Sequence, residues 1–316
     1  MYFAEEFSKV TTGNFPSGAG WILMCDTRLG RAGVLELDRV AKRFGAVVAC
    51  ADVSLTVRYG EVYGLAGLGK TTVSRLAAGL LTPDSGAVRR AGERLGYLPQ
   101  SRGLYPRMRV LDTLVYLAAL HGADVNESIR AAEIWAARFG LRGRRSTRVR
   151  QLSAADQQRL WLAAAFVNTP DVLVLDEPFT GLDADTAELL VSLVAERTAA
   201  GAVVLLATDE LDVVARLCDR VGVLHNGRMV AEGAVAELLA AARVELAVSA
   251  APTDWAAGLP GVEVLSVHNG HVRLALAAGV DDQAVLAAAL AAGPVHSFTR
   301  VPTGLAEVLR DVVGEE

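Results

Sequence analysis

Short apolar runs alternate with longer amphipathic stretches over residues 34–241. The run Val172-Leu173-Val174-Leu175 is fully apolar, which is typical of a strand buried on both faces of a sheet. Similar strands are expected at 34–37, 53–57, 62–65, 203–207 and 221–224. Because amphipathic stretches separate these runs, the pattern predicts an α/β fold with a mainly parallel sheet.

The helices are predicted from apolar residues that recur at i, i+3, i+4 and i+7. Two stretches have this spacing. The first carries Val73, Leu76, Ala77 and Leu80, and the second carries Leu160, Ala163, Ala164 and Val167. A mostly helical insertion is expected over 110–140. Another helix should follow Asp183, with a capping-box-like start formed by Asp185 and Glu188.

A second domain is predicted over residues 242–316. Strands are expected at 244–249, 262–267, 272–276 and 296–301, and helices at 254–257 and 281–291. Asn269-Gly270 is a strong hairpin signal, and the flanking His268 and His271 indicate a solvated turn rather than a metal site. The order β-α-β-β-α-β predicts a ferredoxin-like α+β unit, followed by a helix carrying Leu305, Val308, Leu309 and Val312.

Composition limits where the protein works. The net charge of -5 gives no support for binding nucleic acid, and the spacing of the three cysteines fits neither a metal nor a redox motif. No run approaches the roughly 18–20 apolar residues that span a bilayer, and no secretory signal is recognisable. We therefore expect a cytoplasmic protein that reaches a membrane through a partner. Residues 1–33 lack sustained periodicity and are expected to be a disordered extension, with Met1 or Met24 as the true start.

Two adjacent carboxylates, Asp176 and Glu177, follow the apolar run 172–175. In parallel sheets the carboxyl ends of the strands form the edge that binds ligands, so both side chains are expected there. The first carboxylate can hold Mg²⁺, and the second can act on a water molecule.

A glycine-rich segment from Gly64 to Thr71 fits the pattern G-x-x-x-x-G-K-[ST]. The backbone N–H groups of such a loop turn toward phosphate, and the following helix adds the positive end of its dipole. Lys70 is one of only three lysines in the chain, which favours a chemical role. The alternative is a plain glycine-rich turn between a strand and a helix.

These motifs form an ordered set with LSAADQQR from Leu152 to Arg159 and with Gly181-Leu182-Asp183. Residues 34–316 as a whole resemble the ATP-binding subunit of an ABC transporter. The segment from Arg102 to Pro106 and the second domain are similar to the drug- and ion-exporting branch, which carries such a tail. The resemblance implies a P-loop NTPase cassette with a helical insertion.

The resemblance also implies roles for the site residues. Lys70 would contact the β- and γ-phosphates, and Thr71, Gln100 and Asp176 would hold Mg²⁺. Glu177 would be the general base, with Gln100 close to the attacking water. Further nucleotide contacts are expected from Phe44, which would stack on adenine, and from Gly64, Gly67, Leu68, Gly69, Thr72, Ser153, Ala155 and Asp183. Alternatives stay open, because Phe44 also fits a core residue, Gln100 a solvated loop, and Ser153 with Asp156 an ordinary helix start.

Three departures from the family pattern concern the phosphates. The glycine-rich loop is three residues shorter than the family's, so either the preceding strand frays or the phosphate cradle is incomplete. In the LSAADQ segment, Ala155 replaces a glycine and Asp156 a neutral amide. After the strand 203–207, Asp209 stands at the catalytic position where the family has histidine, and it cannot donate as histidine does.

The function implied by the resemblance is Mg²⁺-dependent ATP hydrolysis that powers export. Two such subunits, identical or different, would sandwich ATP at the inner face of the membrane and drive a separate permease. One alternative is a degenerate subunit that binds ATP, hydrolyses it slowly and acts as a regulatory partner. Another is a soluble ABC ATPase without a transporter. The sequence leaves the cargo open.

Overall fold

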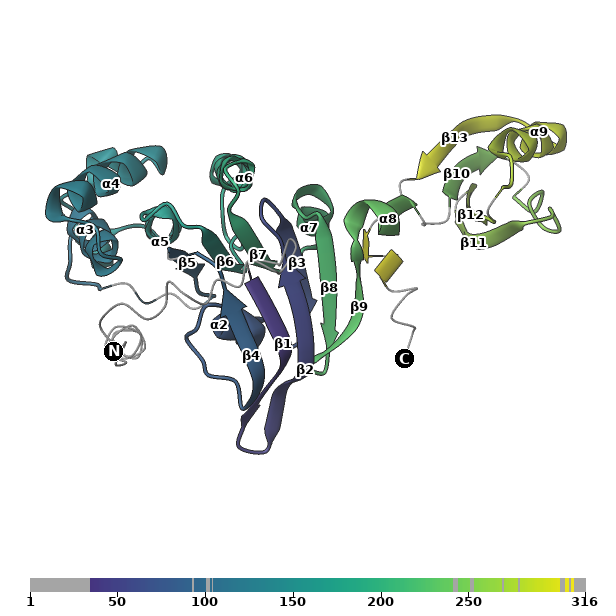
Figure 1. Ribbon diagram of the computed structural model, residues 1–316. Coiled ribbons are helices and arrows are strands. Elements are labelled where there is room, and N and C mark those ends of the chain that lie inside the picture. The colour runs from purple at the N-terminus through teal and green to yellow at the C-terminus, as the bar shows by residue number, and fades with distance from the viewer. Residues whose placement is uncertain are drawn as a thin grey trace. The chain divides into compact units, whose positions relative to one another are not determined.

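The computed structural model describes residues 35–92, 94–100, 103, 105–240, 244–250, 253–268, 270–277, 279–301, 305, 306, 308 and 309 (Figure 1). The expected extension over 1–33 lies outside these residues, as do Arg102, Asn269 and Val312. The chain forms two compact units, one ending at Glu232 and the other starting at Gly233.

A six-stranded sheet forms the centre of the first unit. In the order β5-β6-β7-β3-β8-β9, its strands are Leu95–Leu98, Val172–Asp176, Val203–Ala207, Val62–Gly67, Arg220–His225 and Arg228–Ala234. The pairs β5–β6, β6–β7, β7–β3 and β3–β8 are parallel, which confirms the predicted class of sheet. Asp176 lies opposite Ala207 in the register of β6 and β7, so the residues that follow these two strands become neighbours.

A separate antiparallel sheet lies in the same unit, with the order β2-β1-β4. Its strands are Leu35–Phe44 (β1), Val47–Val57 (β2) and Ser85–Arg90 (β4). Buried residues of β1, β2, β3, β6 and β7 share one hydrophobic core with the helix α2 (Lys70–Ala77). This shared core fixes α2 at the end of β3.

The remaining helices of the first unit follow the predicted pattern, except that α7 (Leu211–Leu217) was not predicted. They are α3 (Val110–Leu120), α4 (Val125–Arg138), α5 (Ala154–Phe166), α6 (Ala184–Ala199) and α7, with short 3₁₀ turns at Arg142–Arg144 and Val149–Gln151. The insertion consists of α3 and α4, which Figure 1 shows beside α5. The ring centroids of Trp135 on α4 and Phe166 on α5 are 5.3 Å apart, so aromatic packing joins the insertion to α5.

The start of α6 corrects one expectation. Asp183, rather than Asp185, caps this helix, because its carboxylate accepts a hydrogen bond of 2.8 Å from the backbone N–H of Thr186. Asp185 lies in the first turn, where a negative charge still favours the positive end of the helix dipole. No helix of the described ranges is long and apolar enough to cross a membrane.

The second unit contains α8 (Val235–Ala240), α9 (Asp282–Ala292) and a four-stranded antiparallel sheet. The strands are β10 (Val244–Ala250), β11 (Val262–His268), β12 (His271–Leu276) and β13 (Val295–Val301), in the order β11-β12-β10-β13. This strand order is that of a ferredoxin-like sheet. The helix expected at 254–257 is wrong, since hydrogen-bonded turns occupy 255–258. The predicted hairpin forms, with His268 opposite His271.

Candidate functional site

The loop between β3 and α2 consists of only Leu68 and Gly69. Gly67 and Gly69 have φ angles of +92° and +109°, a region that favours glycine. A Cβ on Gly67 would lie 1.9 Å from the carbonyl oxygen of Leu224, and one on Gly69 would lie 2.8 Å from that of Ala49. The strand therefore does not fray to lengthen the loop, and close backbone approach fixes both glycines.

The other two loop candidates are placed very differently. Gly64 lies inside β3, where a Cβ would come within 2.9 Å of Cγ1 of Val214 on α7. Packing of α7 on the sheet thus gives a reason for glycine at this position that does not involve phosphate. The side chain of Leu68, in contrast, is 69% exposed at the tip of the loop.

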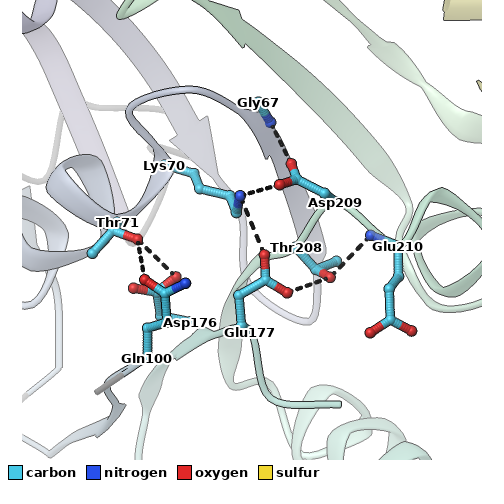
Figure 2. Close-up of polar contacts among 9 residues, drawn as sticks. All are labelled: Gly67, Lys70, Thr71, Gln100, Asp176, Glu177, Thr208, Asp209 and Glu210. Carbon is cyan, nitrogen blue, oxygen red and sulfur yellow. Dashed lines mark hydrogen bonds and ion pairs between the residues drawn. The ribbon is translucent and has the colours of Figure 1, made fainter. Parts of the chain in front are cut away.

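The ammonium group of Lys70 is held between two carboxylates. It forms an ion pair with Asp209 and a second one, at 3.2 Å, with Oε1 of Glu177 (Figure 2). The Lys70 side chain is only 12% exposed. Burial works to lower the pKa of Lys70, but the two carboxylates outweigh it and the pKa is raised. Lys70 is therefore positively charged and aimed at the edge where β6 and β7 end.

Asp209 has a second contact in the loop, because its Oδ1 accepts a hydrogen bond of 2.9 Å from the backbone N–H of Gly67. Burial opposes ionisation of this carboxyl, whereas Lys70 and the Gly67 N–H lower its pKa. The Asp209 carboxylate thus accepts from the backbone N–H of Gly67 and from Lys70, the lysine that the sequence predicts to bind phosphate.

Three oxygen atoms meet on the other side of Lys70. The hydroxyl of Thr71 lies 3.3 Å from Oδ1 of Asp176 and 3.3 Å from Oε1 of Gln100. Asp176 is 1% exposed, and its Oδ2 is buried with no hydrogen-bond partner. Burial raises the pKa of Asp176 to about 6, against the hydrogen bond from Thr71.

This oxygen set fits Mg²⁺, which prefers carboxylate, hydroxyl and carbonyl oxygens and is commonly held by one or two carboxylates. The unpaired buried oxygen of Asp176 is a group that a cation would compensate. Within the described ranges, no cluster of three or more His, Cys, Asp or Glu side chains could hold a metal ion. The mixed set around Thr71 is therefore the candidate.

Glu177 follows Asp176 in a strained backbone conformation, with a φ angle of +50°. Its backbone N–H donates to the carbonyl of Ala207 at 2.8 Å, which ties this turn to the end of β7. Its Oε2 accepts a hydrogen bond of 3.0 Å from the hydroxyl of Thr208, a fully buried residue. The hydroxyl of Thr208 in turn accepts from the backbone N–H of Glu210 at 3.1 Å.

The LSAADQ segment forms the beginning of α5. Ser153 caps this helix, since its hydroxyl accepts a bond of 3.0 Å from the backbone N–H of Asp156. That hydroxyl keeps its own proton and can still donate to a phosphate. Ala155 is exposed. The charge of Asp156 is partly compensated by Arg144 at 3.6 Å and Arg159 at 3.8 Å.

The structure brings some of the predicted residues together and leaves others apart. The six residues lie together as two neighbouring sets of contacts, one of Lys70, Glu177 and Asp209 and the other of Thr71, Gln100 and Asp176 (Figure 2). Among the described residues, no hydrogen bond joins the hydroxyl of Ser153 to this group, and the same holds for Thr72. Phe44 ends β1 and is 49% exposed, so it is not a core residue but an accessible ring.

Sequence reasoning missed two contributors. Thr208 was assigned no role from the sequence, yet its hydroxyl holds Glu177. The register of β6 and β7 is the signal that could have found it, since neighbouring parallel strands end side by side. Arg159 links α5 to the cap of α6 through Asp183 at 2.7 Å and Thr186 at 3.0 Å. A salt bridge between two such segments has no signature in the sequence.

Comparison with known families gives two matches in this chain. The family described as ABC transporter matches residues 50–180, and the one described as ATP-binding protein DrrA1-3-like, C-terminal domain matches residues 235–313. An uncharacterized ABC transporter ATP-binding protein of Alkalihalophilus pseudofirmus is 31% identical over 261 residues, which are 79% of this chain and 98% of that protein. The corresponding protein YhaQ of Bacillus subtilis is 34% identical over 65% of this chain and 72% of its own length.

Other relatives have more specific names. The Nod factor export ATP-binding protein I of Burkholderia lata is 35% identical over 63% of this chain and 70% of its own. Among solved structures, an ATP-binding subunit of an ABC transporter is 28% identical, with a TM-score of 0.60 over 65% of this chain and 91% of that one. A dimeric bacterial ABC transporter cassette has a TM-score of 0.58 at 23% identity, over 64% and 98%.

This chain belongs to the family of ABC transporter ATP-binding proteins. Its fold is that of an ABC cassette, which confirms the predicted P-loop NTPase class. Proteins of this family bind ATP as the nucleotide subunits of transporters, so the function class predicted from the sequence is also confirmed.

Proposed function

We propose that this protein is the Mg²⁺-dependent ATPase subunit of an ABC exporter. The observation that carries the proposal is that two contacts, Lys70 with Glu177 and Thr71 with Asp176, lie together at the carboxyl edge of the parallel sheet. Export as the direction is supported by the Nod factor export relatives and by the DrrA1-3-like second unit.

The residues divide the work as follows. Lys70 and the backbone N–H of Gly67 hold phosphate oxygens, Leu68 and Gly69 form the loop between them, and Thr72 lies in the first turn of α2. Thr71, Asp176 and Gln100 hold Mg²⁺, which when bound neutralises charge on the transferring phosphate. Phe44 provides a ring on which adenine stacks. Gly64 lies within β3, where the close packing of α7 requires a glycine.

Glu177 is the general base in this proposal. The Thr208 hydroxyl orients the carboxylate of Glu177, and the positive φ angle of Glu177 sets the direction in which its side chain leaves the backbone. Without nucleotide, Oε1 of Glu177 is paired with Lys70 at 3.2 Å. Once a phosphate binds Lys70, this oxygen is released and Glu177 polarises the attacking water.

The partners follow from the family. A second ABC subunit places its Ser153 and Ala155 against the γ-phosphate of the first, as the dimeric arrangement of a structural neighbour suggests. Asp183 caps α6 beside that surface and pairs with Arg159. A separate integral-membrane permease holds both subunits at the inner face of the cell membrane.

A second candidate function is a subunit that binds ATP and hydrolyses it slowly. Two observations favour it, the two-residue loop before α2 and the carboxylate of Asp209 on Lys70. The retained Thr71, Asp176 and Glu177 speak for an active enzyme.

The test is phosphate release by the purified protein, with and without Mg²⁺ and with and without its membrane subunit. We expect Mg²⁺-dependent turnover that Glu177→Gln lowers by about a hundredfold or more while ATP still binds. Glu210→Gln is the matched control, because Glu210 is exposed and its side chain points away from Lys70 in Figure 2. Equal turnover in Glu177→Gln and the wild type would refute the assignment of the base.

A further inference from the structure

The carboxylate of Asp209 is bound as a phosphate oxygen pair would be. One of its oxygens accepts from the backbone N–H of Gly67 at 2.9 Å, and the other pairs with the ammonium of Lys70. The two donors flank the two-residue loop between β3 and α2, which Figure 2 shows curling above Lys70. They are a backbone amide and a lysine at a helix N-terminus, which together form an anion site in P-loop proteins.

The Gly67 amide has a single N–H to donate, and its backbone is held in the sheet. Gly67 is the last residue of β3 and is paired with Leu224 of β8. A Cβ on Gly67 would lie 1.9 Å from the Leu224 carbonyl oxygen, so the backbone has no room on that side. A phosphate that uses this N–H must therefore displace the carboxylate.

Asp209 itself is free to leave. Its side chain is 62% exposed, whereas that of Lys70 is 12% exposed. Asp209 also lies between the end of β7 and the start of α7, outside both elements. Because the carboxylate is exposed to water, an anion of higher charge can take its place on Lys70.

We propose that Asp209 determines nucleotide affinity by competing with phosphate for Gly67 and Lys70. The inference rests on the proposed function, because it takes these two groups to be the phosphate donors. The carboxylate occupies the site until a nucleotide di- or triphosphate displaces it, and its charge then faces the bound phosphates. A nucleotide monophosphate, which does not reach Lys70, is not subject to this competition.

The test is equilibrium binding of ATP, ADP and AMP to the full-length protein and to Asp209→Asn. This variant keeps the size of the side chain and removes its charge. We expect ATP and ADP to bind about tenfold more tightly than to the wild type, the scale of one charge-assisted contact, with AMP unchanged. Glu210→Gln, which removes the same charge one residue further on, should change none of the three.

Equal or weaker ATP binding in Asp209→Asn would overturn the proposal, as would an equal gain for AMP or in Glu210→Gln. Asp209→His is a second variant that also removes the carboxylate, in case the first does not fold. Lys70→Ala separates the two hypotheses. If the wild type binds ATP through Lys70 and Asp209→Asn gives no gain, only the competition fails. If no variant binds ATP, the proposed function fails with it.

Thermal unfolding gives an independent readout. Asp209→Asn should have a lower Tm than the wild type without nucleotide, because the Lys70 and Gly67 donors lose an ionised acceptor. Its Tm should rise more than that of the wild type when ATP is added, since tighter binding stabilises the folded state further. An unchanged Tm increment would contradict the proposal, because a carboxylate with a purely structural role predicts that result.

Discussion

The two halves of the site meet at Lys70 and Thr71 but differ in how their polar groups are satisfied. In the phosphate half, the donors of Gly67 and Lys70 already have carboxylate acceptors. In the metal half, Thr71, Gln100 and Asp176 bring oxygen atoms together, and Oδ2 of Asp176 is buried without a partner. The donors of the first half are thus already engaged by carboxylates, whereas the second half keeps a buried carboxylate oxygen without a hydrogen-bond partner.

Two of the departures from the family pattern lie in the half whose donors are already engaged. The short loop and Asp209 both affect the phosphate half, whereas the metal half keeps its expected residues. Changes to the first half should therefore act on nucleotide affinity, and changes to the second on stability and hydrolysis.

The largest effect is expected from Lys70→Ala. This variant removes the phosphate lysine and leaves Asp209 and Glu177 without their shared counter-ion. ATP affinity, measured by calorimetric titration, should fall by about a hundredfold or more. Lys42→Ala is the control, because Lys42 loses only an ion pair of 2.7 Å with Asp84. Unchanged affinity in Lys70→Ala would remove the basis for a phosphate half.

The next effect concerns the pH dependence of stability in the metal half. Burial raises the pKa of Asp176 to about 6 in the folded protein, from 3.8 as the ordinary value. As pH rises from about 4 to about 6, the unfolded chain releases this proton first, so the folded state loses stability. The loss is on the order of 2–3 kcal/mol and is complete above about pH 6.

Denaturant unfolding between pH 4 and pH 7, with a chelator present, measures this loss. The difference in unfolding free energy between the wild type and Asp176→Asn should change across that range, since the amide does not titrate. A difference that stays constant would mean that the pKa of Asp176 is not raised. Added Mg²⁺ and ATP should reduce the loss in the wild type.

A smaller effect is expected from Thr208→Val, which removes the hydroxyl that holds Glu177. Turnover should fall about tenfold, with ATP affinity unchanged, because the base is no longer oriented while the phosphate donors remain. Thr208→Ser keeps the hydroxyl and should restore most of the activity. If serine is as poor as valine in steady-state assays, the residue acts by packing and not by positioning.

Most of the fold could be predicted because it depends on local periodicity. The apolar run 172–175 became β6, and the strand 203–207 was found with its observed bounds. Strands β4 and β9 were missed, since none of their residues is fully buried and neither has an apolar run like that of β6. The prediction of a helix at 254–257 was wrong because the segment has only four residues and is followed at once by Gly258 and Pro260, which disfavour a helix.

The site was predictable in its residue types but not in its contacts. The spacing from Gly67 to Thr71 and the pair Asp176-Glu177 identified the main groups. The contact of Asp209 with the Gly67 amide depends on how the end of β7 lies beside that of β3, across 142 positions of sequence. From the sequence, aspartate at position 209 predicts only the loss of the hydrogen-bond donor that a histidine would provide. The structure shows in addition that the Asp209 carboxylate accepts from Gly67 and Lys70.

In our proposal, Asp209 restrains the phosphate half of a site whose metal half keeps its expected residues. The most direct test is steady-state hydrolysis of Mg-ATP by the wild type and by Asp209→His, assayed side by side. The account predicts a kcat/KM about tenfold higher in the variant, because a competing carboxylate is replaced by a possible donor. It is contradicted if the wild type already turns over at about 1–10 s⁻¹, an ordinary enzyme rate, and Asp209→His is no faster.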